Sequence, residues 1–292
     1  MKKSILLLLA LALVSATASG QLLWKVTGNG GAKPSYILGT HHFAPISTLD
    51  SIPGFRDAFE SVDEIYGELD DSEMAKPESS LLTLALMAAP ADSTLTKVLT
   101  KAQLDSLSTY MTELAGRPID AAAYDSMNPA AIGMVIMSLT LDKAMPGRSG
   151  GSIDSHVQTL ARQAGKTIHG LETMTEQLTS LFGDPISVQV RDLMATVAQG
   201  DPIPMSRQLY SLYRAGDLGR IHRLMNDPKF STSTDGNKKL VDDRNHAWAD
   251  FLIGILPTTA IMIVVGAAHL PGEEGLINLL RKTGFTVSPV TE

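Results

Sequence analysis

The chain has 292 residues, of which 44% are hydrophobic and 19% are charged, a composition typical of globular proteins. It contains no cysteine, which excludes disulfide bonds, thiolate metal sites and lipid attachment to an N-terminal cysteine. The net charge is −7 and no basic cluster follows the first residues, so we expect no nucleic acid partner.

The N-terminal segment has the three parts of a secretory signal peptide. Two lysines begin the chain, an apolar run covers Ile5–Val14, and small residues follow up to Gly20. The apolar run is too short to span a bilayer comfortably, and no later segment is a transmembrane candidate. We therefore expect residues 1–20 to be removed, leaving 21–292 as one domain. This mature domain would be exported to the periplasm or secreted, with no membrane association after cleavage.

The first part of the mature chain indicates a βαβ arrangement. Two β-like runs, 22–27 and 35–38, flank an Asn-Gly turn signal and predict a hairpin. A helix is predicted over 53–62 and a strand over 64–70, because a proline-initiated apolar periodicity precedes a short β-like run.

The middle of the chain differs in composition. Residues from about 77 to 147 are rich in Ala, Leu and Met with helical periodicity, which predicts a helical insertion. Its methionines are typical of core filling. Within this insertion, helices are predicted at 95–114 and 130–141. An α/β pattern then resumes, with strands predicted at 166–172, 261–265 and 285–289 and helices at 153–164, 174–182, 186–199, 204–214, 217–226, 238–255 and 273–282. The fold class is therefore α/β, a central mixed sheet flanked by helices and carrying this insertion.

Four of the predicted strands end in residues that suit a metal or catalytic site: His42, Glu68, Glu172 and His269. The two histidines close matching Gly-x-x-His segments, one after each apolar run. Because ligands of open α/β sheets bind at the carboxyl ends of strands, we expect both imidazoles in one pocket. With cysteine absent, this predicts a divalent-metal site with nitrogen and oxygen ligands.

His41 stands directly before His42, and side chains alternate along a strand, so only one of the two rings should face the site. The match with the second motif favours His42.

Glu68, Glu172 and Arg244 are candidate site residues, but each also has a structural interpretation that needs no active site. Glu68 is a candidate ligand or general base, or a solvent-facing acid in an acidic turn. Glu172 is a candidate metal ligand, a candidate base acting on metal-bound water, or the N-terminal cap of the helix that follows. Arg244 lies among charged residues, so it belongs either to a solvated helix face or to a site that stabilises negative charge.

The segment Gly147–Gly151 matches the Gly-x-Ser-x-Gly pattern of serine hydrolases. That pattern requires a strand that runs directly into the serine, and here Asp142–Pro146 intervenes. We therefore do not expect a serine nucleophile.

Taken together, these segments resemble the TraB/GumN family, which is related to the TIKI proteases. The resemblance covers nearly all of the mature chain, and its pieces are specific only in combination. They are Leu22–Val26, Tyr36–His42, Glu68–Asp70, Ile153-Asp154, Gly165-Lys166, Gly170–Thr173 with Glu176-Gln177, Arg244-Asn245 and Val265–Gly272. The family usually has an aliphatic residue where His41 stands.

The resemblance implies an erythromycin-esterase/ChaN-like α/β fold with a divalent-metal site on the two Gly-x-x-His motifs. TIKI members are metal-dependent proteases supported by manganese or cobalt. Carried over to this chain, the family implies His42 and His269 as metal ligands and Glu68 as a ligand or catalytic base. It implies that Arg244 and Asn245 orient substrate or stabilise the tetrahedral intermediate, with Glu172 and Asp154 supporting the site.

The resulting hypothesis is an exported metallohydrolase, a peptidase that uses metal-activated water from a Mn, Co or Zn site to cleave a peptide or protein substrate. Glu68 is the preferred residue for shuttling the proton, and Arg244 would stabilise the developing negative charge. Two alternatives stay open. One is a non-catalytic metal or haem-iron binding protein on the same fold. The other is a metal-independent, esterase-like hydrolase with a histidine as general base. The substrate, the metal and the oligomeric state are left open by the sequence.

Overall fold

A computed structural model describes residues 21–31, 33–146, 151–227 and 238–291. The predicted signal peptide and most of the Gly147–Gly151 segment lie outside these residues. Within them, no helix combines the length and apolar character needed to cross a membrane.

The strands form one mixed sheet, which confirms the predicted α/β class. Its order is β4-β3-β5-β2-β1-β6. The neighbours from β4 to β2 are parallel, whereas β1 runs antiparallel to both β2 and β6. The strands are β1 (Leu23–Thr27), β2 (Ser35–Thr40), β3 (Glu64–Gly67), β4 (Thr167–Gly170), β5 (Ile261–Gly266) and β6 (Thr286–Pro289).

The sheet is covered on both faces. Successive residues of a strand point to opposite faces, and in β3 the Tyr66 ring lies 6.0 Å from that of Phe251, while Gly67 approaches the Gln158 side chain. Phe251 belongs to α13 (Asp243–Ile255) and Gln158 to α7 (Ile153–Gln163), so these helices cover opposite faces. Every residue of the central β5 is buried, as its unbroken apolar run leads one to expect for a parallel strand between two helical layers.

A second, purely helical part has a core of its own and, beside it, a smaller cluster around Ala131, Leu178 and Phe182. Its helices are α3 (Pro77–Met87), α4 (Leu95–Val98), α5 (Lys101–Ala115), α6 (Pro129–Ala144), α8 (Met174–Phe182), α9 (Ile186–Gln199) and α10 (Ile203–Arg214). The core contains Met111, Ile132 and Leu193, so residues that follow β4 contribute to it as well as those of the predicted segment 77–147. The reason is that α6 carries apolar residues around most of its circumference and needs neighbours on several sides.

One predicted helix is interrupted. The periodicity over 95–114 predicts a single helix, but α4 ends at Val98 and α5 begins at Lys101. Thr100 explains the break, because its hydroxyl accepts a hydrogen bond from the backbone N–H of Gln103, whose side chain in turn accepts from the Thr100 N–H. This capping box starts a new helix at that point.

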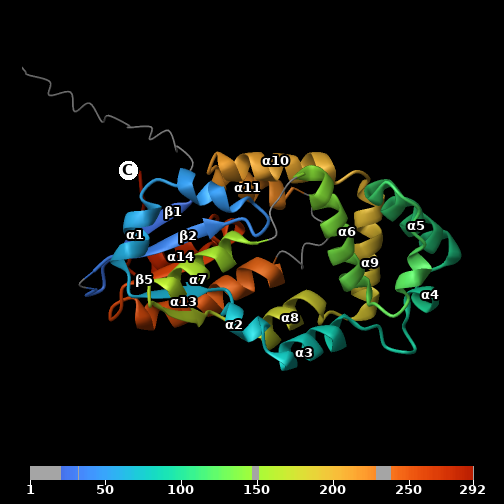
Figure 1. Cartoon of the computed structure of the whole chain (residues 1–292), viewed down its shortest axis with the longest axis horizontal. Coiled ribbons are helices and arrows are strands. Elements are labelled where there is room, and N and C mark those ends of the chain that lie inside the picture. The colour runs from blue at the N-terminus through green and yellow to red at the C-terminus, as the bar shows by residue number, and fades with distance from the viewer. Residues whose placement is uncertain (1–20, 32, 147–150, 228–237, 292) are drawn as a thin grey trace, which may run out of the picture.

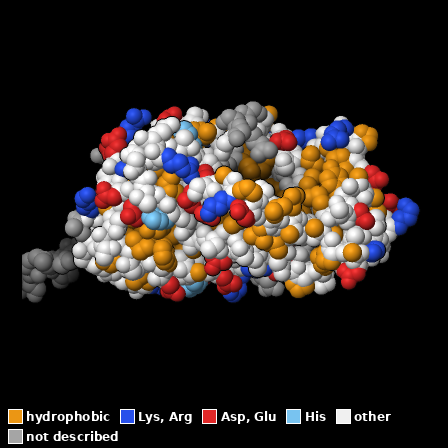
Figure 2. Space-filling model, turned by 60° about the horizontal axis from the view of Figure 1, so that its bottom comes forward, with side chains coloured by type: hydrophobic (Ala, Val, Ile, Leu, Met, Phe, Trp, Pro, Cys, Tyr) orange, Lys and Arg blue, Asp and Glu red, His pale blue; other side chains and the backbone are white. Residues whose placement is uncertain are grey.

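Figure 1 shows the sheet with α7, α13 and α14 at one end of the molecule and α4, α5, α6 and α9 at the other. The remaining helices with described bounds are α1 (Phe55–Ser61), α2 (Asp71–Met74), α11 (Leu218–Met225) and α14 (Leu276–Lys282). In Figure 2 a hollow lies near the middle of the face turned forward, and hydrophobic side chains gather beside it.

Candidate functional site

The four predicted strand-end residues meet at one edge of the sheet. Because β2, β3, β4 and β5 are parallel, their carboxyl ends lie side by side, and the register pairs Thr40 with Gly266. Both Gly-x-x-His segments therefore leave the sheet together. Glu68 lies between the two rings, with Oε1 3.9 Å from His42 Nε2 and 3.8 Å from His269 Nε2.

The His42 ring is held by Asp154, which stands in the first turn of α7. Asp154 Oδ2 lies 2.9 Å from His42 Nδ1, and its other oxygen accepts a 2.6 Å hydrogen bond from the Thr40 hydroxyl. This pairing places the proton on Nδ1 and turns Nε2 toward Glu68. Burial lowers the pKa of His42, but the carboxylates of Asp154 and Glu68 together outweigh that effect and raise the pKa to about 9.

The His269 ring is held by Asn245 of α13. The Asn245 amide donates to the carbonyl oxygens of His269 and Glu274, so its Oδ1 must be the acceptor for His269 Nδ1, 2.8 Å away. The proton of His269 therefore sits on Nδ1, and Nε2 carries a lone pair. Burial lowers the pKa of His269 to about 4, which keeps the ring neutral at pH 7.

Glu68 is a buried, strongly ionised carboxylate. Its Oε1 accepts from the Gly266 N–H at 2.9 Å, and its Oε2 accepts from Arg244 Nη2 at 2.6 Å and from Gln177 Nε2 at 3.4 Å. Burial alone would raise the pKa of this carboxyl. The imidazoles, the guanidinium and the Gly266 N–H around it outweigh that effect and lower the pKa to about 2.

Arg244 and Glu172 form a buried ion pair. Arg244 Nε and Nη2 donate to the two oxygens of Glu172 at 2.9 and 2.7 Å, and the guanidinium lies 4.6 Å from the centre of the Trp248 ring. The side chain of Arg244 is only 13% exposed, so the interpretation as a solvated face is wrong. The capping role considered for Glu172 is also wrong, because Thr173 caps α8 with its own hydroxyl.

His41 faces away from Glu68 into an aromatic cluster. Its ring lies 5.9 Å from that of Tyr210 and 5.4 Å from that of Tyr213. Burial among these side chains lowers the pKa of His41 to about 4. The structure thus places His42 beside Glu68, as the match between the two motifs predicts.

Two residues that the sequence analysis did not single out also shape the site. Thr40 fixes Asp154 through its hydroxyl, and Gly266 leaves room between the three candidate ligands. A Cβ atom at Gly266 would lie 3.5 Å from His42 Nε2 and 3.4 Å from Glu68 Oε1. Both residues belong to the Gly-x-x-His segments, so their proximity to the histidines was the available signal.

The donor atoms suit a divalent ion, although the ion's complete ligand set is not preformed. Two imidazole nitrogens and a carboxylate oxygen are the ligands that Zn²⁺ and similar metals prefer. In each histidine the other ring nitrogen, Nδ1, is hydrogen-bonded to an oxygen acceptor, as in metal-binding histidines. Among the residues that the structure describes, however, no three His, Asp or Glu side chains already stand in metal-binding geometry.

The two neutral histidines predict acid sensitivity of the metal-free protein. His41 and His269 have pKa values of about 4 when folded against 6.5 when unfolded, so the unfolded chain binds more protons in that window. Their stabilisation is present above pH 6.5 and is lost as the pH falls toward 4. The free energy of unfolding of the chelated protein, measured with urea, should drop over this range. A His41→Phe variant should lose less, and an equal loss in both proteins would contradict the assignment.

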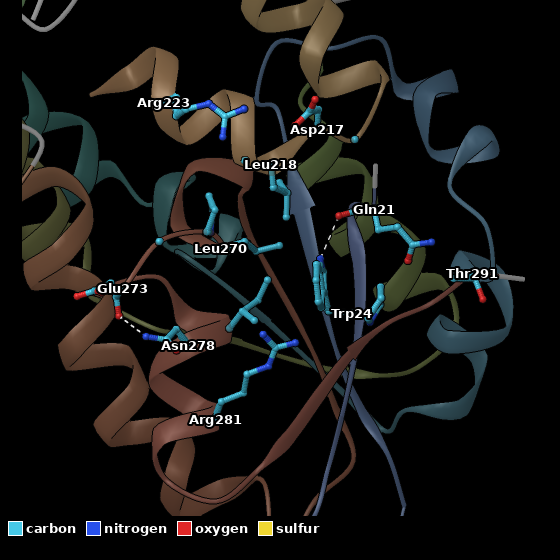
Figure 3. Close-up of a pocket in the computed structure, with 16 residues that line it drawn as sticks. Gln21, Trp24, Asp217, Leu218, Arg223, Leu270, Glu273, Asn278, Arg281 and Thr291 are labelled. Atoms are coloured by element: carbon cyan, nitrogen blue, oxygen red, sulfur yellow. Dashed lines mark hydrogen bonds between the residues drawn. The ribbon is translucent and has the colours of Figure 1, made fainter. Parts of the chain in front are cut away.

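A separate pocket lies beside β1, α11 and α14 and is drawn in Figure 3. Its volume is about 890 Å³, and its walls include Trp24, Leu218, Leu270 and Arg281. The Arg281 guanidinium points toward the Trp24 ring, 5.6 Å from its centre. The side chains of His42, Glu68, Glu172, Arg244 and His269 do not line this pocket, so it is distinct from the candidate site.

Comparison with known proteins identifies a family but no individual relative. No curated protein and no solved structure matches the chain significantly. A sequence model of the TraB/PrgY/gumN family, in contrast, matches residues 22–289, which include all six strands and every residue of the candidate site. The chain therefore belongs to the TraB/PrgY/gumN family.

Proposed function

We propose that this chain is an exported, divalent-metal-dependent hydrolase that acts on peptides or proteins. One observation carries the proposal. His42 and His269 turn their Nε2 atoms toward the same carboxylate oxygen, and the Nδ1 atom of each ring is hydrogen-bonded to an oxygen acceptor. This is how proteins orient imidazoles toward a metal. Export rests on the signal-like segment at residues 1–20, and the peptide substrate on the family resemblance.

His42, His269 and Glu68 would hold the ion, with Mn, Co or Zn as the candidates. A divalent ion supplies Lewis acidity and lowers the pKa of water, which is the chemistry that amide hydrolysis needs near neutral pH. Glu68 suits the role of ligand, because a carboxyl with a pKa of about 2 stays ionised and is a weak base.

The carboxylates beside the proposed ion differ in how they could move a proton. Glu68 stays ionised with a pKa of about 2 and is a weak base. Burial raises the pKa of Glu172, but both of its oxygens accept hydrogen bonds from Arg244, so its role would be to hold that arginine. The guanidinium of Arg244 would orient a substrate oxygen and stabilise the negative charge that develops on it.

The metal-independent alternative has one observation in its favour, the His42–Asp154 pair, which resembles the base and orienting acid of hydrolases. With a pKa of about 9, however, His42 is protonated at pH 7 in the metal-free chain, so its Nε2 must lose a proton before it can act either as a base or as a metal ligand. The non-catalytic alternative, metal or haem-iron binding alone, predicts ion retention without turnover.

The deciding experiment titrates Mn²⁺, Co²⁺ and Zn²⁺ into the chelated mature protein by calorimetry, followed by assays with a peptide library. Binding near one equivalent, with cleavage that stops on chelation, would support the proposal. Binding without cleavage of any peptide would favour the non-catalytic alternative. Cleavage that survives chelation would favour the histidine-base alternative.

Replacing Gly266 by alanine should block the ion and leave the fold intact. The new methyl group would make ordinary contacts, at 3.4 to 3.5 Å, with Glu68, His269 and His42, so it fits the folded chain but fills the space between the ligands. We expect the metal affinity to fall about a hundredfold, the upper range for disturbing a site's surroundings. Calorimetry measures the affinity and thermal unfolding checks the fold. Wild-type affinity in a folded variant would count against the site.

The equivalent change at Gly133 of α6 is a matched control. A Cβ atom there meets no other atom within 4 Å, so Gly133→Ala should leave metal affinity unchanged.

A further inference from the structure

Arg244 binds an atom that the proposed metal site would use. Its Nη1 lies 3.3 Å from His269 Nε2, whereas its Nη2 lies 2.6 Å from Glu68 Oε2, the carboxylate oxygen that does not face the two histidines. The hydrogen bonds of Asn245 put the His269 proton on Nδ1, so Nε2 offers a lone pair, and the guanidinium N–H donates to it. One lone pair cannot bind an N–H group and a metal ion together.

The same guanidinium has a second partner that lies outside the proposed ligand set. Glu172 accepts from Nε at 2.9 Å and from Nη2 at 2.7 Å, a bidentate contact with both carboxylate oxygens. Nη1 also donates to the Leu240 carbonyl at 2.9 Å. If Arg244 released His269, these contacts and the bond to Glu68 would still satisfy four of its five N–H groups.

We propose that Arg244 is an internal competitor for the metal, and that ion binding requires its guanidinium to leave His269 while Glu172 keeps hold of it. Arg244 thereby regulates occupancy of the site, and Glu172 is a positioning residue that acts through it. The inference rests on the proposed function, since it concerns the same metal site.

Competition predicts how two substitutions combine. Arg244→Met should raise the affinity for Mn²⁺ about tenfold or more, since a hydrogen bond from a charged group no longer has to be broken. Glu172→Gln should lower the affinity about tenfold, because the guanidinium then loses its alternative partner. In the Arg244→Met background, Glu172→Gln should have almost no effect, because it acts only through the arginine.

A simple charge effect makes a different prediction. Removing a cation or an anion near the site would change the affinity additively, so Glu172→Gln would matter as much in the methionine background as in the wild type. Arg244→Lys separates the two explanations further. It keeps the charge, but one ammonium group cannot reproduce the forked contacts to Glu172, Glu68 and His269. Competition therefore predicts tighter binding for the lysine variant, and a charge effect predicts the wild-type value.

The experiment is calorimetry with Mn²⁺ on the chelated mature protein and these four variants, with circular dichroism to check folding. If Arg244→Met fails to fold because Glu68 and Glu172 lose their partner, the lysine variant carries the test. Tighter binding of the lysine variant would support the inference. If the methionine variants fold, a loss of the Glu172→Gln effect in the Arg244→Met background would support it as well.

Equal affinities of the wild type and the lysine variant would overturn the inference while the metal site stands. If the Arg244 variants bind Mn²⁺ and the wild type does not, the inference is supported and the proposed function of the wild-type chain is contradicted. No binding by any folded protein would overturn both.

A second readout follows the guanidinium itself. It packs 4.6 Å from the centre of the Trp248 ring, and the chain has only one other tryptophan, Trp24. In a Trp24→Phe background, Zn²⁺, which does not quench by paramagnetism, should shift the emission of Trp248. The shift should be smaller when Arg244 is methionine, and an identical shift in both would contradict movement of the arginine.

Discussion

The double variant His42→Ala/His269→Ala is expected to lose metal binding altogether while keeping the fold. A partner that only orients a ligand is worth about 10- to 100-fold in affinity, so removing two ligands should cost at least about a thousandfold. Calorimetry with Mn²⁺, Co²⁺ and Zn²⁺ on the chelated protein measures the loss, and far-UV circular dichroism checks the fold.

His41→Ala is the matched control, since it removes the neighbouring imidazole, which contacts Tyr210 and Tyr213 instead of Glu68. It should bind metal as the wild type does. If the folded double variant still binds one equivalent, the ion sits elsewhere. If His41→Ala alone abolishes binding, the choice between the two adjacent histidines is wrong.

Asn245→Leu is expected to lower both stability and metal affinity. Asn245 is fully buried and joins the His269 ring to the carbonyls of His269 and Glu274. Leucine has a similar volume but no polar atoms, so it leaves a buried ring N–H and two carbonyls without this partner. Each such group costs about 1 to 3 kcal/mol, and we expect about 3 kcal/mol overall. The metal affinity should fall about 10- to 100-fold, because His269 loses the contact that fixes its tautomer.

Urea unfolding of the chelated protein and calorimetry give the two quantities. Asn278→Ala is the control, because Asn278 makes the same kind of bond, to the carbonyl of Glu273, at an exposed position of the same region. It should change the free energy of unfolding by less than about 1 kcal/mol. Comparable losses in the two variants would show that Asn245 has no special place in the site.

The sequence predicts the meeting point of His42, Glu68, Glu172 and His269 because parallel strands impose it. Each residue follows an apolar β-like run, and only a parallel arrangement brings such ends to one edge. The location of the site could therefore be inferred without knowing which strands are neighbours.

The contacts of Arg244 could not be inferred in the same way. It lies between Asp243 and Asn245 on a helix whose sequence is charged near its start, and a polar run predicts an exposed face. It is buried against Glu68 and Glu172, which follow β3 and β4, are distant in sequence and become neighbours only in the sheet. The full extent of the helical part could not be predicted for a related reason. α9 packs on α6, although β4 lies between these two helices in the sequence.

The central position of β5 has a consequence for how the chain acquires its structure. This strand joins β3 to β2, yet it is formed by Ile261–Gly266, close to the end of the chain. Until those residues are available, the two halves of the sheet have no common neighbour and His42 cannot approach Glu68. Such long-range pairing slows folding. A nascent chain should therefore stay incompletely folded until nearly all of it has been synthesised, and truncation before Ile261 should leave two separate sheet fragments.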